Sequence, residues 1–350
     1  MFGIKHPIAS AAMGPFRTTE LALAVTEAGG LGMISHAHQS MDGREVNAIV
    51  ALKKNLDYVV EHTDGIFGFN IRTSRNTVDC DKLISETSKH IMGSPKLREQ
   101  CLYALTSAGS ASRMPKNKDF QKLGENSQIK HFHVAPALWL ADKCVAAGCD
   151  GLVVTGFEGG GHQAYEKVGG LVLLQQVQQK HPDIPKIACG GFATGEGMAA
   201  ALALGAGGIA MGSRFIASLD SEFHENYKNV VPPAKAQDTL VATGTLGSIR
   251  LWKNKYAFSK GLVKSKEEKI AEETARTDHR TAISKEELAE ELRKDAYAAF
   301  AAYQGDMDNG AVLLGQSIGI INRLESVSDI IETVIKGAEK ALQKAITFIE

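Results

Sequence analysis

The sequence predicts a parallel (β/α)₈ barrel, and three observations support this fold class. Short apolar runs alternate with helical segments at intervals of about 25 residues, which is typical of repeated βα units. Several of these runs end in glycine or another small residue, as strands do at the mouth of a barrel. The length of 350 residues suits one such barrel with additional segments.

Eight apolar segments are the predicted strands: residues 4–12, 31–35, 65–71, 101–106, 129–134, 151–155, 184–189 and 208–211. Helical patterns lie between them at residues 21–28, 41–62, 137–147, 171–180 and 197–204. Residues 73–99 are expected to hold further helices.

The βα rhythm stops after Phe215. Residues 241–252 predict a hairpin, the Lys- and Glu-rich residues 265–303 predict solvated amphipathic helices, and residues 327–348 predict a last helix. We therefore expect a cofactor-binding barrel over 1–215. A mostly helical extension over 216–350 is expected to pack over the open end of the barrel.

The overall composition excludes several classes of function. The net charge of −1, from 39 basic and 40 acidic residues, offers no electrostatic basis for binding nucleic acid or an anionic membrane. No stretch of about 20 apolar residues is present, and the N-terminus lacks a signal-peptide pattern. The five cysteines form no C-x-x-C pair, which indicates a reducing compartment. We expect a cytoplasmic monomer or homodimer that acts on a small molecule.

Two glycine-bearing turns follow the last two predicted strands. Gly190 and Gly191 end one strand, and Gly212 and Ser213 end the next. Without a Cβ, backbone N–H groups can approach an anion closely, and the last two loops of a barrel often bind phosphate. These residues predict a phosphate cradle, although ordinary turn glycines would give the same pattern.

A histidine follows three glycines after the sixth predicted strand, in the run Gly159-Gly160-Gly161-His162. Catalytic groups of barrels lie at the carboxyl ends of strands, and an imidazole with a pKa near neutrality suits proton transfer. His162 is therefore our candidate general acid or base, with a simple loop histidine as the alternative. No histidine or carboxylate spacing predicts a metal site.

These segments resemble the nitronate monooxygenase family, which includes NADH:quinone reductases and flavin-type enoyl-acyl-carrier-protein reductases. The resemblance covers most of the chain and rests on residues 7–13, 27–32, 68–70, 156–162, 190–191, 211–215 and 315–316. It implies a TIM barrel that binds FMN non-covalently, with NAD(P)H as the electron donor in the reductase branch.

The resemblance also implies where the flavin would be held. The implied contacts are Ala12, Met13, Gly14, Asn70, Thr106, Gly160, Gly161 and Gln316, together with the cradle residues Gly190, Gly191, Gly212 and Ser213. Met13 could equally be a core residue, and Asn70 could cap a loop. His133, on the fifth predicted strand, is a second catalytic candidate through the resemblance alone.

Our leading hypothesis is an FMN-dependent oxidoreductase that oxidises alkyl nitronates with O₂. The alternative keeps FMN and uses NAD(P)H to reduce quinones or activated alkenes such as enoyl thioesters. A flavin-free phosphosugar isomerase or lyase on the same barrel stays open, because a phosphate cradle alone does not identify a flavin.

Overall fold

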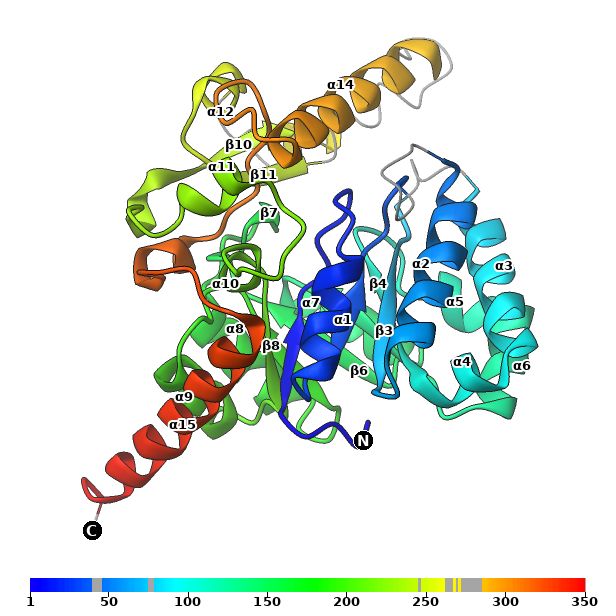
Figure 1. Cartoon of the computed structure of the whole chain (residues 1–350), viewed down its shortest axis with the longest axis horizontal. Coiled ribbons are helices and arrows are strands. Elements are labelled where there is room, and N and C mark those ends of the chain that lie inside the picture. Colours follow the sequence, from blue (N-terminus) through cyan, green and yellow to red (C-terminus); the bar gives the residue numbers. More distant parts are fainter. Residues whose placement is uncertain are drawn as a thin grey trace.

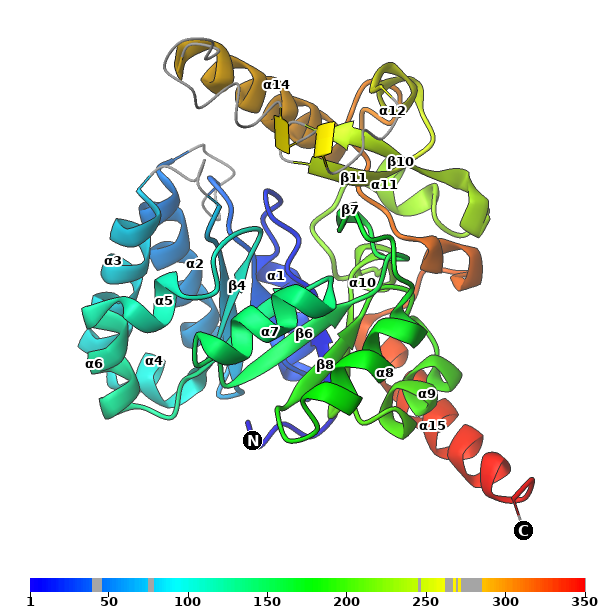
Figure 2. The same ribbon diagram turned by 180° about the vertical axis from the view of Figure 1, so that it is seen from behind.

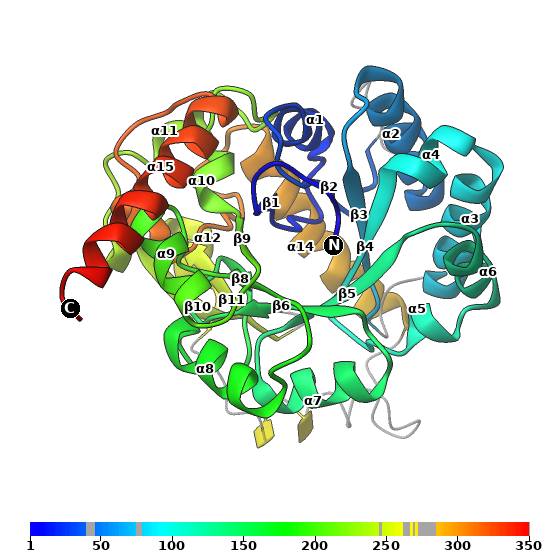
Figure 3. The same ribbon diagram turned by 90° about the horizontal axis from the view of Figure 1, so that it is seen from below.

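The computed structural model describes residues 1–39, 46–74, 79–244, 247–261, 267–268, 270–271 and 285–349. Eight parallel strands form a barrel (Figures 1 and 3), in the order β1-β9-β8-β6-β5-β4-β3-β2. A parallel bridge between Ala9 and Leu31 joins the two ends of this sheet. The predicted fold class is confirmed.

The barrel strands are β1 Ile8–Ser10, β2 Gly32–Ile34, β3 Phe67–Arg72, β4 Cys101–Ser107, β5 Lys130–Ala135, β6 Gly151–Thr155, β8 Lys186–Cys189 and β9 Gly208–Met211. Each overlaps one of the eight predicted segments. Large side chains fill the interior, where the rings of Tyr103 and Phe132 lie 5.3 Å apart and Phe2 packs against both. Gly151 leaves room for this packing, since a Cβ there would lie 2.2 Å from the Phe132 ring.

The helices outside the strands are α1 Thr19–Glu27, α2 Ala48–His62, α3 Cys80–Gly93, α4 Pro95–Gln100, α5 Arg113–Lys116, α6 Lys118–Asn126, α7 Leu138–Ala146, α8 Gly170–Lys180 and α9 Gly195–Ala203. The helix predicted from residue 41 is seen from Ala48, where the Asn47 side chain caps it, and residues 40–45 lie outside the described ranges. The expected further helices of 73–99 are α3 and α4.

The last helix, α15 (Val327–Ile346), lies against the side of the barrel, between α9 and α1 (Figures 1 and 3). Its buried residues Ile330, Ile331 and Val334 belong to the same apolar cluster as residues of α1 and α9. A Cβ on Gly195 would lie 2.4 Å from the Ala338 nitrogen, so α9 and α15 approach closely there. α15 therefore takes the place of the eighth barrel helix.

The residues between β9 and α15 form a long insertion at the barrel mouth (Figures 1 and 2). They include α10 Ser213–Ile216, α11 Glu225–Asn229, η1 Ala236–Asp238, β10 Thr239–Gly244, β11 Gly247–Trp252, α12 Lys255–Ser259, α14 Lys285–Tyr303 and η2 Gln316–Ile320. The antiparallel pairing of β10 and β11 confirms the predicted hairpin. Within the ranges given above, no helix combines the length and the apolar character that a membrane crossing requires.

Two contacts attach the insertion to the start of the barrel. Phe16 stacks on Tyr303, with ring centroids 5.7 Å apart, and Phe223 meets both rings edge-on. The carboxylate of Glu222 accepts the backbone N–H groups of Glu20 and Leu21 at 3.1 and 3.2 Å, in the first turn of α1. A helix leaves those N–H groups without internal partners, so the insertion completes α1.

Candidate active site

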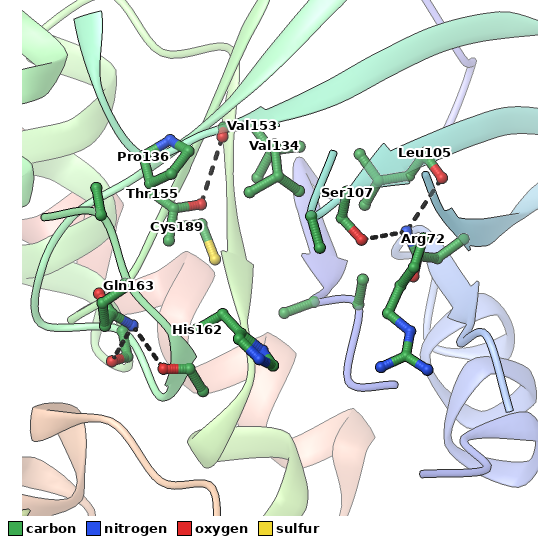
Figure 4. Close-up of a pocket in the computed structure, with 18 of the residues that line it drawn as sticks. Arg72, Leu105, Ser107, Val134, Pro136, Val153, Thr155, His162, Gln163 and Cys189 are labelled. Atoms are coloured by element: carbon green, nitrogen blue, oxygen red, sulfur yellow. Dashed lines mark hydrogen bonds between the residues drawn. The ribbon is translucent and has the colours of Figure 1, made fainter. Parts of the chain in front are cut away.

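A cavity of about 1360 Å³ lies at the carboxyl ends of the strands, beneath the insertion. Figure 4 shows its wall, with side chains that reach inward from several strands and loops. The structure brings together most of the predicted site residues in this lining: Ala12, Met13, Gly14, Asn70, Gly160, Gly161, His162, Gly190, Gly191, Gly212 and Ser213. They come from both ends of the barrel sequence and meet because the sheet closes.

The two glycine turns lie side by side, because β8 and β9 are neighbours and Cys189 pairs with Ala210. Gly190 has a φ of +83°, and a Cβ there would lie 2.7 Å from the carbonyl oxygen of Gly156. A Cβ on Gly212 would instead enter the cavity, where its contacts with the described residues would be Ala11 Cβ at 3.7 Å and Met13 Sδ at 4.0 Å. This open approach to the backbone fits a phosphate group.

The loop that carries His162 is fixed by the insertion. β7 (Gly161–His162) pairs antiparallel with β11, and His162 lies opposite Ile249. The backbone N–H of Gln163 donates to Ser248 O at 2.8 Å, and its side-chain amide donates to Gly159 O at 2.6 Å. The imidazole of His162 is left facing the cavity (Figure 4).

A buried arginine of β11 anchors the same loop. The guanidinium of Arg250 donates to the Phe157 carbonyl at 2.9 and 3.2 Å and to Thr239 Oγ1 at 2.9 Å. It also lies 4.9 Å from the centre of the Phe157 ring. Arg250 is therefore a positioning residue for the loop, and no motif in the sequence indicated it.

Replacing Arg250 by glutamine is expected to lower kcat by about 10- to 100-fold, because the His162 loop loses its anchor. We expect a loss of about 2 kcal/mol in stability, since hydrogen bonds from a charged donor are removed. Turnover is to be measured well below the melting temperature, so that unfolding does not contribute. Arg293→Gln, an exposed change on α14, is the matched control, and equal kcat in both variants would contradict this role.

The His162 ring is open to the cavity, yet the surrounding protein walls remove much of its hydration. This desolvation and the charge of the nearby Arg72 guanidinium, opposed by Asp295, together lower the pKa of His162 to about 4. The imidazole is therefore neutral at pH 7 and able to accept a proton.

Arg72 ends β3 and lines the cavity on another wall (Figure 4). Its Nε is buried and has no hydrogen-bond partner among the described residues. Its backbone N–H donates to His36 Nδ1 at 3.0 Å, which holds the end of the strand. A buried guanidinium nitrogen without a partner is costly, so this side chain is suited to an anionic ligand.

The structure does not bring His133, Thr106 or Gln316 into the lining. Side chains alternate along a strand, and Leu105, Ser107 and Val134 are the neighbours that face the cavity. Thr106 and His133 point outward and bond to each other at 2.6 Å, and burial lowers the pKa of His133 to about 3. The Gln316 backbone N–H donates to Glu158 O at 2.8 Å, so it braces the His162 loop.

Asn70, a predicted flavin contact, lies in the cavity wall. Its side-chain amide donates to Leu105 O at 3.1 Å and to Ser107 Oγ at 3.2 Å, which fixes its orientation. Across the described residues, no three His, Cys, Asp or Glu side chains gather in a way that could hold a metal ion. The cradle, Asn70, Arg72 and His162 are thus polar features of the part of the lining that the sequence predicted or that adjoins it.

A family model described as nitronate monooxygenase matches residues 1–337. The chain belongs to the nitronate monooxygenase family. It is therefore an oxidoreductase, in a family whose members are flavin enzymes in general.

Individual relatives of this family member carry different names. The chain is 28% identical to the (3aS,4S,5R,7aS)-5-hydroxy-7a-methyl-1-oxo-octahydro-1H-indene-4-carboxyl-CoA dehydrogenase of Mycobacterium tuberculosis, over all of this chain and 98% of that one. A dehydrogenase of the same name from Rhodococcus jostii is 31% identical over 69% of this chain and 61% of its own length. A probable nitronate monooxygenase of Staphylococcus saprophyticus is 28% identical over 71% of this chain and 75% of its own length.

Two solved structures share the fold over nearly the whole length. FabK from Thermotoga maritima superposes with a TM-score of 0.77 and 29% identity, over 99% of this chain and 97% of that one. The nitroalkane oxidase of Streptomyces ansochromogenes superposes with a TM-score of 0.71 and 21% identity, over 98% of each chain, which shows a common fold.

Proposed function

We propose that this protein is an FMN-dependent oxidoreductase that oxidises alkyl nitronates with O₂. The observation that carries the proposal is that a neutral imidazole, His162, shares one cavity with the guanidinium of Arg72 and with the paired glycine turns. The buried Nε of Arg72 has no hydrogen-bond partner among the described residues. The first group can move a proton, the second can hold an anion, and the third fits a cofactor phosphate.

The lining residues divide between cofactor and substrate. Gly190, Gly191, Gly212 and Ser213 would hold the FMN phosphate, and the residues from Ala12 to Gly14 would lie along the ring with Asn70. When bound, FMN would supply the redox chemistry: it would accept electrons from the substrate and pass them to O₂. Arg72 would orient the anionic nitro group of a nitronate, and His162 would take the α-proton when the substrate is a neutral nitroalkane.

A second candidate is the NAD(P)H-dependent reduction of an enoyl thioester or a quinone. The size of the cavity favours it, since about 1360 Å³ exceeds the usual range for one small ligand. Relatives named carboxyl-CoA dehydrogenases also support it. A flavin reaction accommodates both candidates, because the protein selects the partner and the cofactor carries out the electron transfer.

Anaerobic stopped-flow spectroscopy separates these candidates. Under the first, an alkyl nitronate is expected to bleach the flavin absorbance rapidly, and admission of O₂ should restore it. Under the second, NADH or NADPH should bleach it instead. Bleaching by a reduced nicotinamide and not by any nitronate would overturn the nitronate proposal and leave the FMN enzyme intact.

The cofactor itself is tested by extraction. The purified protein is expected to be yellow and to release FMN rather than FAD, because the paired turns form one phosphate site and no dinucleotide-binding glycine motif follows a strand. Chromatography of the heat-released flavin measures this. A colourless protein that takes up no flavin on reconstitution would instead favour the phosphosugar isomerase or lyase.

A further inference from the structure

The wall of the cavity carries an excess of positive charge that the chain as a whole lacks. Its described lining contains the cations Arg72, Arg113, Lys116 and Lys143, and only one carboxylate, that of Glu166. Over the whole chain 39 basic residues face 40 acidic ones, so this excess is local. Such concentration of one sign in a concave wall attracts anions.

Three of these cations lie on elements that follow β4 and β5 rather than on those that carry the cradle. Arg113 begins the short helix α5 and Lys116 ends it, while Lys143 lies on α7. These elements follow β4 and β5, whereas the cradle follows β8 and β9. The cations therefore cannot serve the same phosphate as the glycine turns.

Carboxylates of the described residues neutralise these three cations only weakly. The nearest carboxylate oxygen to Arg113, on Asp81, is 3.9 Å from its Nε, at the limit of an ion pair. Lys116 is exposed and forms no ion pair with a carboxylate of the described residues. Lys143 has its Nζ 4.8 Å above the Trp139 ring rather than on a carboxylate. Ligand phosphates would satisfy these cations at low desolvation cost.

An exposed tryptophan lies among them. Trp139 is 43% exposed, although a ring of this size is normally covered. Its Nε1 donates to Glu166 Oε1 at 2.8 Å, which fixes the plane of the indole at the cavity wall. Lys143 covers one face of the ring. A fixed, exposed indole is a stacking surface for a nucleobase.

We infer that Arg113, Lys116, Trp139 and Lys143, the nucleotide arm of the cavity, bind the adenine and diphosphate of a nucleotide-bearing substrate. The cations would hold the phosphates, and the indole would stack on the adenine. The inference extends the second candidate function, since coenzyme A thioesters and NAD(P)H share this chemistry. The reactive end of either molecule would then extend toward His162 in the same cavity.

Calorimetric titration of the FMN-loaded full chain tests the arm, with coenzyme A, NADH and NADPH as separate probes. We expect at least one to bind. Lys116→Glu and Lys143→Glu should each weaken that binding at least tenfold, and Trp139→Ala should do the same without a change of charge. Lys122→Glu, an exposed charge reversal on α6 outside the cavity lining, is the matched control and should leave the Kd within twofold.

The probe that binds identifies the source of the nucleotide. Coenzyme A binding alone indicates a thioester substrate, and binding of a nicotinamide nucleotide alone indicates an electron donor. Wild-type protein that binds none of the three, or arm variants that bind as the Lys122 control does, would overturn the arm. Flavin reduction by nitronate is measured on the same wild-type preparation, so failure of the arm and failure of the proposed function are separate results.

Discussion

Replacing Gly212 by valine is expected to leave the barrel folded and to weaken FMN binding at least about 100-fold, a loss of about 2.7 kcal/mol. A Cβ at this position meets no described atom closer than 3.7 Å, so the protein itself has room for it. The added side chain would instead occupy the space in which the phosphate approaches the backbone. Flavin content per chain, measured by absorbance, and circular dichroism test the two parts of this expectation.

Two other glycines serve as comparisons for the valine variant. Gly124 lies in α6, and a Cβ there would meet no described atom within 4 Å, so Gly124→Val should retain full flavin content. Gly190→Val should damage the fold, because its φ is +83° and the Cβ would lie 2.7 Å from Gly156 O. Full flavin occupancy in Gly212→Val would show that the phosphate binds elsewhere.

Replacing His162 by alanine is expected to retain FMN and to lower turnover by about 10²- to 10⁴-fold, the usual contribution of a positioned proton-transfer group. With a preformed nitronate the loss should be smaller, because the α-proton has already been removed. Steady-state kinetics on a nitroalkane and on its nitronate measure this difference. His62→Ala, an exposed histidine at the end of α2, is the control.

The pH profile offers an independent readout of His162. The pKa of its ring is lowered to about 4, and the neutral form is the base. Proton abstraction should therefore be fully available at neutral pH and be lost as pH falls through about 4, rather than through 6 or 7. The alanine variant should lose this acidic limb. Unchanged turnover and an unchanged profile would show that His162 is a loop residue without a role in proton transfer.

The sequence was sufficient to predict the eight strands and the position of most of the site. Strand order in a parallel barrel follows chain order, so residues at the carboxyl ends of predicted strands are bound to meet at one mouth. Gly190, Gly212 and His162 could be assigned to it for that reason alone. Arg72 could also have been found, because it lies two residues after Asn70 and strand side chains alternate.

Other features depend on contacts between distant segments and have no local signal. Arg250 reaches Phe157 only because β11 pairs with the short strand at His162. His133 was placed in the site through family resemblance, and the one-residue alternation of β5 turns it outward. The cations of the nucleotide arm lie on two separate helices, α5 and α7, so neither their spacing in the sequence nor the near-neutral total charge indicates that they line one cavity.

The position of α15 has a consequence for the folding of the protein during its synthesis on the ribosome. The groove between α1 and α9, which holds Leu21, Val25 and Met198, is covered by α15, which is translated more than 100 residues after the last barrel strand. A nascent chain that has finished all eight strands still exposes this apolar groove. The groove stays exposed if synthesis stops before Val327. A barrel that lacks α15 presents an apolar surface that chaperones and neighbouring nascent chains can bind. Chains truncated before Val327 should accordingly be recovered as aggregates, and supplying α15 as a separate peptide should restore them to solution.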